Sequence, residues 1–298
     1  MNIPLNKMEN LKVKIFNSPE DMQKFSISEK LNGKKISFVP TMGYLHEGHL
    51  SLMREGKKYG DILVISIFVN PTQFGPNEDL NRYPRDFEGD LKKCESVGVD
   101  AIFYPTNENM YNKDFQTYVE VKKVTQNLCG LSRPIHFRGV ATVVAKLFNI
   151  VQPDYAFFGE KDFQQLVVIK QMVKDLNFPI EIIGCPIVRE HDGLAMSSRN
   201  AYLNDEERKQ ALCLYKSILK VKELFHNGIK NSKKLIDEAV KIIKSHPLAE
   251  IDYVKIVDIN TMEDIEGEIN KDALYALAVK IGKTRLIDNC KLLINKEA

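Results

Sequence analysis

The sequence has no strong excess of one charge and no long apolar run. Its 298 residues contain 42 Lys and Arg against 40 Asp and Glu, a formal net charge of +2. Proteins that bind nucleic acid or an anionic membrane usually carry a clear basic excess, so neither partner is expected. No segment approaches the ~20 apolar residues that cross a bilayer, and the first 16 residues lack the features of a signal peptide. These absences predict a soluble, cytoplasmic protein.

Paired cysteines are also missing. The five cysteines are Cys94, Cys129, Cys185, Cys213 and Cys290, an odd number with no CxxC spacing. This pattern is typical of reduced thiols in a cytosolic protein rather than of a disulfide framework. We expect all five to serve as small buried apolar residues.

The usual nucleotide-binding fingerprints are absent as well. No GxGxxG follows a predicted strand. The stretch "IGKTRL" (281–286) contains the Gly-Lys-Thr of a P-loop, but that motif needs a glycine where Leu277 stands. The flanking residues predict a hairpin, so we interpret this stretch as a surface turn.

Short apolar runs alternate with amphipathic stretches over residues 34–188. The predicted strands are 34–40, 61–70, 99–105, 154–160 and 179–188. The predicted helices are 47–60, 86–98 and 163–177, with 139–152 a buried helix or, given its β-branched residues, a strand. This alternation predicts an α/β fold with a doubly wound parallel sheet. Ligands of such sheets bind at the carboxyl ends of the strands, where the strand order reverses.

The pattern changes after residue 189, which we take as a domain boundary between 1–189 and 190–298. One long helix is predicted over 203–228, with Asn204 as its N-cap. A second helix is predicted over 233–246. Strands are predicted over 251–259, 273–282 and 284–290, the last two as a hairpin. The C-terminal part is therefore a smaller α+β domain.

Two histidines stand out in "PTMGYLHEGHLSLM" (40–53), which joins a predicted strand to a predicted helix. His46 and His49 resemble a truncated zinc-protease HExxH, but that motif needs a spacing of four and a third ligand. Two solvated turn histidines are a second interpretation. The position favours a third one, since a helix N-terminus attracts phosphate and imidazole N–H groups can donate to phosphate oxygens.

Polar stretches also follow other predicted strands. Gln73, in "NPTQF", can donate to a carboxylate and accept from a hydroxyl, or simply cap its loop. In "GEKD", Lys161 can neutralise phosphate and Asp162 suits a ribose hydroxyl or a magnesium-bound water, although such strings often form solvated turns. Asp86 and Glu88 are acidic enough for magnesium, but solvated surface positions are the preferred interpretation.

These motifs resemble a known family. His-x-Gly-His after a first strand is the HIGH signature of a nucleotidyltransferase superfamily that includes the class I aminoacyl-tRNA synthetases. The surrounding residues are similar to the pantoate–β-alanine ligases. Similar blocks follow in order: "SIFVNPTQF" (66–74), "RYPRD" (82–86), "SRPIHFRGVATVVAKLFNIVQPD" (132–154), "FFGEKDFQQL" (157–166), "DGLAMSSRN" (192–200) and "ALAVKIGKTRLIDN" (276–289).

The resemblance implies a Rossmann-like catalytic domain, a C-terminal lid and a homodimer formed through the N-terminal domain. It also implies ligation of pantoate to β-alanine through a pantoyl adenylate, with ATP and Mg2+. No nucleic acid or membrane partner is expected. The alternatives are another HIGH-type enzyme that acts on a phosphate acceptor and a zinc hydrolase that uses the two histidines.

The same resemblance assigns residues to ligands. Those assigned to ATP are Met42, Gly43, Tyr44, Leu45, His46, Glu47, Gly48, His49, Gly159, Glu160, Lys161, Asp162, Val188, Met196, Ser197, Ser198 and Arg199. Those assigned to pantoate or β-alanine are Gln73, Gln165, Arg133 and His136. His46, His49, Lys161 and Arg199 are the expected catalytic residues, with His49 as the proton donor. Ile135 stands where the family usually has glycine, which leaves the placement of His136 open.

Overall fold

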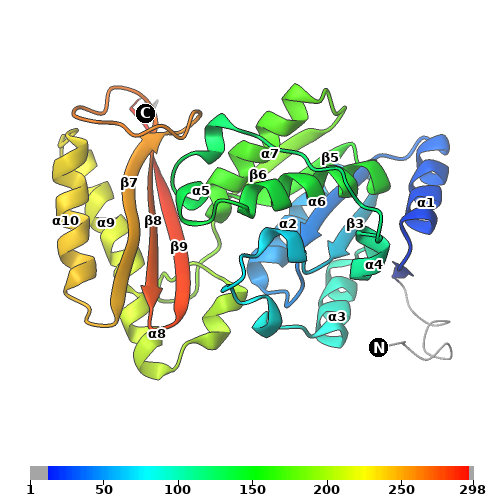
Figure 1. Cartoon of the computed structure of the whole chain (residues 1–298), viewed down its shortest axis with the longest axis horizontal. Coiled ribbons are helices and arrows are strands. Elements are labelled where there is room, and N and C mark those ends of the chain that lie inside the picture. Colours follow the sequence, from blue (N-terminus) through cyan, green and yellow to red (C-terminus); the bar gives the residue numbers. More distant parts are fainter. Residues whose placement is uncertain (1–12, 295–298) are drawn as a thin grey trace. The chain divides into compact units, whose positions relative to one another are not determined.

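A computed structural model describes residues 13–294, which divide into two compact units (Figure 1). The first unit comprises residues 13–120, 138–159 and 169–185. The second unit comprises residues 121–137, 160–168 and 186–294. The last passage from the first unit to the second lies between Cys185 and Pro186.

A six-stranded parallel sheet forms the centre of the first unit, in the order β1-β4-β3-β2-β5-β6. Its strands are β1 (Lys14–Phe16), β2 (Ile36–Thr41), β3 (Ile62–Ile67), β4 (Ala101–Phe103), β5 (Tyr155–Gly159) and β6 (Glu181–Cys185). From β2 the chain proceeds to β3 and β4 on one side, whereas β5 and β6 extend the sheet on the other side. This reversal confirms the predicted doubly wound fold and places its switch point between β2 and β5.

Helices connect these strands. They are α1 (Pro19–Leu31), α2 (Glu47–Gly56), α3 (Phe87–Val97), α4 (Asn107–Met110), α5 (Cys129–Ser132), α6 (His136–Val151) and α7 (Phe163–Asp175). The open assignment over 139–152 is thus settled as helix. Sequence reasoning missed β1 and α1. Although α1 has a proper N-cap in Ser18, it buries only Met22 and Ser26, so it lacks the apolar periodicity that reveals a helix.

Asp154 ties together the starts of the two strands that flank the switch point. Its Oδ2 accepts a hydrogen bond from the Ile36 backbone N–H at 2.9 Å, and its Oδ1 lies 3.0 Å from the Lys35 Nζ. Its backbone N–H in turn donates to the Ile36 carbonyl. Burial raises the pKa of the Asp154 carboxyl, but the Ile36 hydrogen bond and the charges of Lys35 and Lys30 outweigh burial, and the pKa is lowered.

We expect Asp154→Asn to destabilise the protein by about 1.5–3 kcal/mol at pH 7, because a hydrogen-bonded charge is lost. A carboxyl with a lowered folded-state pKa stabilises the fold above its unfolded pKa of 3.8 and loses that effect as the pH falls through the folded value. The difference between wild type and variant should therefore shrink below about pH 4. Urea unfolding at pH 7 and pH 3 measures it, and a difference independent of pH would contradict the assignment.

A three-stranded antiparallel sheet forms the centre of the second unit, in the order β7-β8-β9. Its strands are β7 (Ala249–Asp258), β8 (Ala273–Ile281) and β9 (Thr284–Leu292). The turn from β8 to β9 contains Gly282 with φ +55°, which confirms that the Gly-Lys-Thr stretch is a hairpin turn and not a P-loop. One apolar cluster joins the sheet to helices α9 (Cys213–His226) and α10 (Ser232–Lys244), and another joins it to residues 124–137 and to Phe163.

The single helix predicted over 203–228 is wrong, because the segment forms two helices. Asn204 does cap the first, α8 (Asp205–Ala211), but the chain breaks at Leu212 before α9 (Cys213–His226). Ala211 and Cys213 are both fully buried, and Leu212 packs against the same apolar cluster. Successive residues of one helix point about 100° apart, so a break allows all three to face the core. The next helix, α10 (Ser232–Lys244), follows as predicted.

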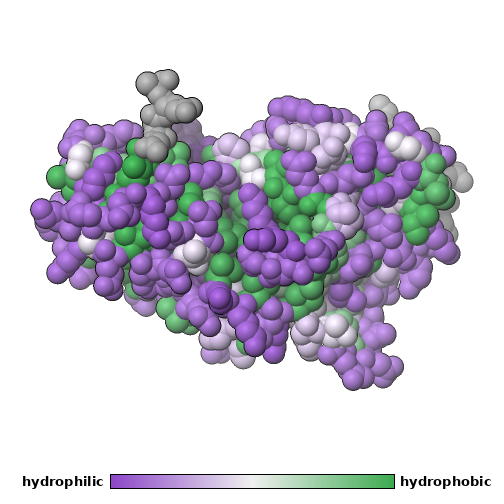
Figure 2. All heavy atoms as spheres, turned by 90° about the horizontal axis from the view of Figure 1, so that it is seen from above, coloured by the Kyte–Doolittle hydropathy of each residue, from purple (hydrophilic) through white to green (hydrophobic). Residues whose placement is uncertain are grey.

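The face shown in Figure 2 is mostly hydrophilic, with scattered apolar patches. Within residues 13–294, no helix is both long and apolar enough to cross a membrane. All five cysteines are free thiols, and four of them are buried, with Cys290 partly exposed. Burial raises the pKa of the Cys94 thiol to about 12, in keeping with a packing role.

Candidate active site

The two histidines of the HxGH motif cap the helix that follows β2. His46 is the N-cap of α2, and its Nδ1 accepts a hydrogen bond from the Gly48 N–H at 3.1 Å. The His49 Nδ1 accepts from the His46 N–H at 3.2 Å, so the two rings form a reciprocal capping box. The ring centroids lie 4.1 Å apart. The predicted strand–turn–helix context is confirmed, and the two imidazoles lie side by side.

These hydrogen bonds determine what the rings can offer. A neutral imidazole has one donor and one acceptor nitrogen, so a ring that accepts at Nδ1 carries its proton at Nε2. Both His46 and His49 therefore have Nε2–H donors. The Gly48 N–H is already used by the cap, so the imidazoles, more than the backbone of the first turn, are the donors suited to an anion here.

A buried carboxylate shapes the turn before the histidines. Gly43 (φ +82°) and Tyr44 (φ +52°) both adopt left-handed backbone conformations. Asp90, which is 1% exposed, accepts hydrogen bonds from the N–H groups of Tyr44 (2.8 Å) and Leu45 (2.7 Å). A side chain at position 43 would approach Ile67 Cγ2 to 2.9 Å. Sequence reasoning missed Asp90, although a carboxylate on the otherwise apolar face of α3 could have signalled it.

Glu47 has a contact of its own at the start of α2. Its carboxylate forms an ion pair with the Arg54 guanidinium, one Nη2–Oε2 distance being 3.2 Å. The hydrogen bond from Arg54 lowers the pKa of Glu47. Because 45% of the Glu47 side chain is exposed, we interpret this pair as a helix-surface contact.

Gln73 is held in a fixed orientation at the carboxyl end of β3. It closes a short 3-10 helix (Pro71–Gln73) whose N-cap is Asn70, a residue only 1% exposed. The Asn70 Nδ2 donates to Gln73 Oε1 and to the Gly139 carbonyl, both at 3.1 Å. The Gln73 Nε2 contacts the Met42 sulfur at 3.2 Å. Gln73 is therefore part of a buried polar network that also reaches Met42 in the loop after β2. Asn70 orients Gln73 in this network, a role that sequence reasoning missed.

In the second unit, four predicted residues form one electrostatic cluster. The Lys161 Nζ lies 3.0 Å from Asp162 Oδ2. Desolvation raises the pKa of the Asp162 carboxyl, but the charge and hydrogen bond of Lys161, together with the electrostatic effects of Arg199 and His136, outweigh it, and the pKa is lowered. Lys161, Arg199 and His136 are thus close enough to act on the same carboxylate, and the ammonium and guanidinium charges of the first two suit an anionic ligand.

Residues 188–199 form an ordered hairpin and a short helix rather than a loose serine-rich loop. The Met196 N–H donates to the Val188 carbonyl at 3.0 Å, and Arg189 pairs with Ala195 in an antiparallel bridge. Ser197 then caps the 3-10 helix Ser198–Tyr202 by accepting from the Arg199 N–H. The hairpin therefore brings together Val188 and Met196, which the resemblance assigns to the same ligand.

The segment before α6 accommodates Ile135 without strain. Ile135 is 41% exposed and is not among the residues with a positive φ, so this position does not require glycine. His136 is the first residue of α6 and is 9% exposed, and its N–H donates to the Arg133 carbonyl at 3.0 Å. Arg133 is the C-cap of the short helix α5. Their predicted ligand contacts stay predictions.

The two neighbouring glutamines of α7 differ in role. Gln164 is 7% exposed and bonds to three backbone groups, the Cys129 N–H and the carbonyls of Val124 and Asn127. It is a structural residue that ties α7 to the 121–137 segment. Gln165 is half-buried, and its predicted role toward pantoate is untested.

Metal-binding groups do not gather in the part of the chain that the structure describes. Within residues 13–294, no group of three His, Cys, Asp or Glu side chains could hold a metal ion. Asp86 caps α3 by accepting from the Gly89 N–H at 3.0 Å, and Glu88 is exposed. This agrees with the interpretation of both as surface residues.

Comparison with known proteins identifies the family. The sequence model described as "Pantoate-beta-alanine ligase" matches residues 14–291. The chain belongs to the pantoate–β-alanine ligase family. Among relatives of this family, the pantothenate synthetase of Geobacter sulfurreducens is 59% identical over 280 residues, covering 94% of this chain and 99% of the relative. That of Sulfurihydrogenibium sp. is 59% identical over 279 residues, covering 93% and 99%.

Solved structures of the ligase family agree with this fold. The pantothenate synthetase of Thermus thermophilus is 41% identical with a TM-score of 0.89, covering 94% of this chain and 100% of that one. The pantoate-beta-alanine ligase of Francisella tularensis, complexed with beta-gamma ATP and beta-alanine, is 35% identical with a TM-score of 0.77, covering 93% and 97%. The ligase family is an enzyme family, and the predicted fold class and resemblance are both confirmed.

Proposed function

We propose that the protein joins pantoate to β-alanine with ATP, forming pantothenate, AMP and pyrophosphate through a pantoyl adenylate. The observation that carries this proposal is the family match over residues 14–291. The geometry supports it, since two imidazole donors stand at the carboxyl end of β2, beside the switch point of the sheet. A solved relative complexed with beta-gamma ATP and beta-alanine agrees with the choice of substrates.

The reaction has two steps. A pantoate carboxylate oxygen attacks the α-phosphorus of ATP, and pyrophosphate leaves with the electron pair of the broken P–O bond. The β-alanine amine then attacks the acyl carbon, loses a proton and displaces AMP. The adenylate is already activated, so no covalent enzyme intermediate is required. The chain's own contribution is positioning and stabilisation of the charge that develops on phosphate oxygens.

Each group of residues has a proposed part in this chemistry. The Nε2–H groups of His46 and His49 donate to phosphate oxygens as pyrophosphate leaves, with His49 as the proton donor. Lys161 and Arg199 neutralise the charge of the triphosphate. To bind Lys161, a phosphate oxygen must compete with Asp162, whose carboxylate already contacts the Lys161 ammonium. The remaining ATP contacts are proposed for the rest of residues 42–49, for 159–162, for Val188 and for 196–199.

Gln73 is the proposed recognition residue for pantoate, near which β-alanine also binds. Asn70 donates to its Oε1, which leaves the orientation of the Gln73 amide fixed before a ligand arrives. A fixed amide can donate to a carboxylate and accept from a hydroxyl, so it suits pantoate better than it would suit a phosphate acceptor. Gln165, Arg133 and His136 are proposed as supporting residues on the same substrate.

Mg2+ is proposed to enter with ATP. Because residues 13–294 hold no cluster of three metal-ligating side chains, the phosphate oxygens themselves would be its main ligands. Its chemistry would be to neutralise charge on the triphosphate.

Product analysis tests the proposal. Incubation of the purified protein with ATP, Mg2+, pantoate and β-alanine should yield AMP and pantothenate in equal amounts. Without β-alanine, the amounts of pyrophosphate and pantoyl adenylate formed should not exceed the amount of enzyme. Liquid chromatography with mass detection measures all four. Formation of ADP in place of AMP would overturn the proposal, since it indicates an acyl phosphate.

The assembly and location are also proposed. We infer a cytoplasmic homodimer formed through the N-terminal domain, a location in keeping with five free thiols. Sedimentation velocity measures the number of subunits, and a monomer at micromolar concentration would exclude the dimer.

We also propose that residues 190–298 act as a lid for the catalytic domain 1–189.

A further inference from the structure

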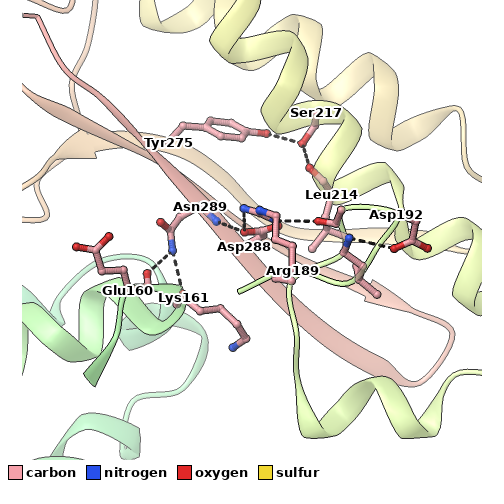
Figure 3. A network of polar contacts seen from close by, with 12 residues as sticks. Glu160, Lys161, Arg189, Asp192, Leu214, Ser217, Tyr275, Asp288 and Asn289 are labelled. Carbon is pink, nitrogen blue, oxygen red and sulfur yellow. Dashed lines mark hydrogen bonds and ion pairs between the residues drawn. The ribbon is translucent and has the colours of Figure 1, made fainter. Parts of the chain in front are cut away.

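Strand β9 carries two adjacent buried polar residues that the proposed chemistry does not use. Asp288 is 2% exposed and Asn289 is 5% exposed. Adjacent residues of a strand point to opposite faces of the sheet, so the two side chains reach different surroundings. Asp288 pairs with Leu277, a member of the cluster that packs on α9, whereas Asn289 pairs with Ala276, a member of the cluster that contains Phe163. Figure 3 shows both side chains and their partners.

Asn289 holds the turn that presents Lys161. Its Nδ2 donates to the backbone carbonyls of Glu160 and Lys161, both at 2.9 Å. An amide has two N–H donors, and both are used here. An aspartate carboxylate at this position could not donate, and its oxygen would face the Glu160 and Lys161 carbonyl oxygens without a hydrogen bond. The Lys291 Nζ, two residues along β9, lies 2.6 Å from Glu160 Oε1 and adds a more exposed contact to the same turn.

Asp288 holds the base of the 188–196 hairpin. Its two oxygens accept from the Arg189 guanidinium at 2.7 and 3.0 Å, a bidentate ion pair. The same guanidinium donates to the Gly193 carbonyl at 3.0 Å and lies 4.7 Å from the centroid of the Tyr215 ring. Arg189 directly follows Val188 and bridges to Ala195. Its position therefore sets the position of both strands of the hairpin.

We propose that Asn289 and Asp288 are positioning residues for ATP: Asn289 fixes the Lys161 turn, and Asp288 fixes the Val188–Met196 hairpin through Arg189. In this proposed role, neither residue needs to touch a substrate. Because the two residues are adjacent on β9, they fix the Lys161 turn and the Val188–Met196 hairpin relative to the same strand. This inference rests on the proposed function of those segments.

The test compares Asn289→Ala, Asn289→Ser and Asn289→Asp with wild type, by steady-state kinetics for each substrate and by thermal unfolding. Misplacement of a catalytic group by about 1 Å costs up to ~10²-fold, so we expect kcat/KM for ATP to fall by about 10- to 100-fold in the alanine and aspartate variants. The serine variant keeps one donor and should lose less. The KM values for pantoate and β-alanine should stay within about twofold of wild type.

Two controls separate positioning from stability. Tyr275→Phe removes the buried hydrogen bond between Tyr275 and Ser217, so it should lower the melting temperature but keep the KM for ATP. Lys291→Ala removes only the more exposed contact to the same turn and should change kcat by less than about twofold.

The outcomes are distinguishable. Wild-type kcat/KM for ATP in folded Asn289→Ala and Asn289→Ser would overturn the positioning role, as would an equal loss toward all three substrates that follows the fraction of folded protein. A wild-type protein that forms no AMP and pantothenate would instead overturn the proposed function itself.

Discussion

Replacement of His49 by alanine is expected to lower the rate of adenylate formation by about 10²–10³, the usual cost of removing one donor aimed at developing charge. The effect should fall on kcat rather than on the KM for pantoate, because the donor is proposed to act as pyrophosphate leaves. Rapid-quench measurement of pantoyl adenylate from ATP and pantoate isolates this step. Near-normal adenylate formation would exclude the assigned role.

The same substitution also removes a helix cap, and a second variant separates the two effects. His49 Nδ1 accepts from the His46 N–H, so His49→Ala should cost the fold about 0.5–2 kcal/mol as well. His46→Asn is the matched control, since asparagine is a preferred N-cap but has no imidazole. It should keep the melting temperature within a few degrees and still lose adenylate formation. A stable His46→Asn variant with full activity would show that His46 serves only as a cap.

Gly139→Ala is expected to damage both the fold and the proposed pantoate site. A β-carbon at Gly139 would lie 2.4 Å from the Thr72 carbonyl oxygen and 2.6 Å from Gln73 Cα. Backbone atoms cannot yield at such distances without displacing the 3-10 helix that carries Gln73. Glycine to alanine in a helix normally stabilises by about 0.5–1 kcal/mol, but overpacking here should destabilise by about 1–3 kcal/mol.

The functional readout of Gly139→Ala is selective. Because Gln73 shifts, kcat/KM for pantoate should fall by about 10²-fold, whereas the KM for ATP should change much less. Asn149→Ala is the matched control, since Asn149 is an exposed residue of the same helix, and it should behave as wild type. Unchanged stability and unchanged pantoate kinetics in Gly139→Ala would contradict the tight approach of α6 to the 3-10 helix.

Local sequence patterns predicted the sheet of the first unit well. The run that became β3 is β-branched and apolar, and five of its six residues are buried, as expected of a strand covered on both faces. The prediction failed where tertiary contacts override the local pattern, and also where the local apolar pattern is weak. The break at Leu212 follows from three successive residues that all face the core, and α1 escaped notice because it buries so little.

In the candidate site, too, some residues can be identified from the local sequence, whereas others act through partners that are distant in the sequence. His46, His49 and Gln73 follow strands and carry their own chemistry, so the sequence alone was enough to propose them as site residues. Asp90 and Asn70 act on groups up to 69 residues away, on the Tyr44 N–H and the Gly139 carbonyl. The apolar face of α3 could have marked Asp90 as unusual, but no local pattern identifies the partners of Asp90 or Asn70, which only the fold brings close to them.

The reciprocal cap at the start of α2 also has an entropic consequence. A free imidazole side chain samples several rotamers, and ordering it for a ligand costs binding free energy of about 0.5–1.5 kcal/mol. His46 and His49 are already held by hydrogen bonds at Nδ1, so they lose this freedom when the chain folds. A phosphate that meets their Nε2–H groups does not bear that cost, and more of its interaction energy remains for the transition state.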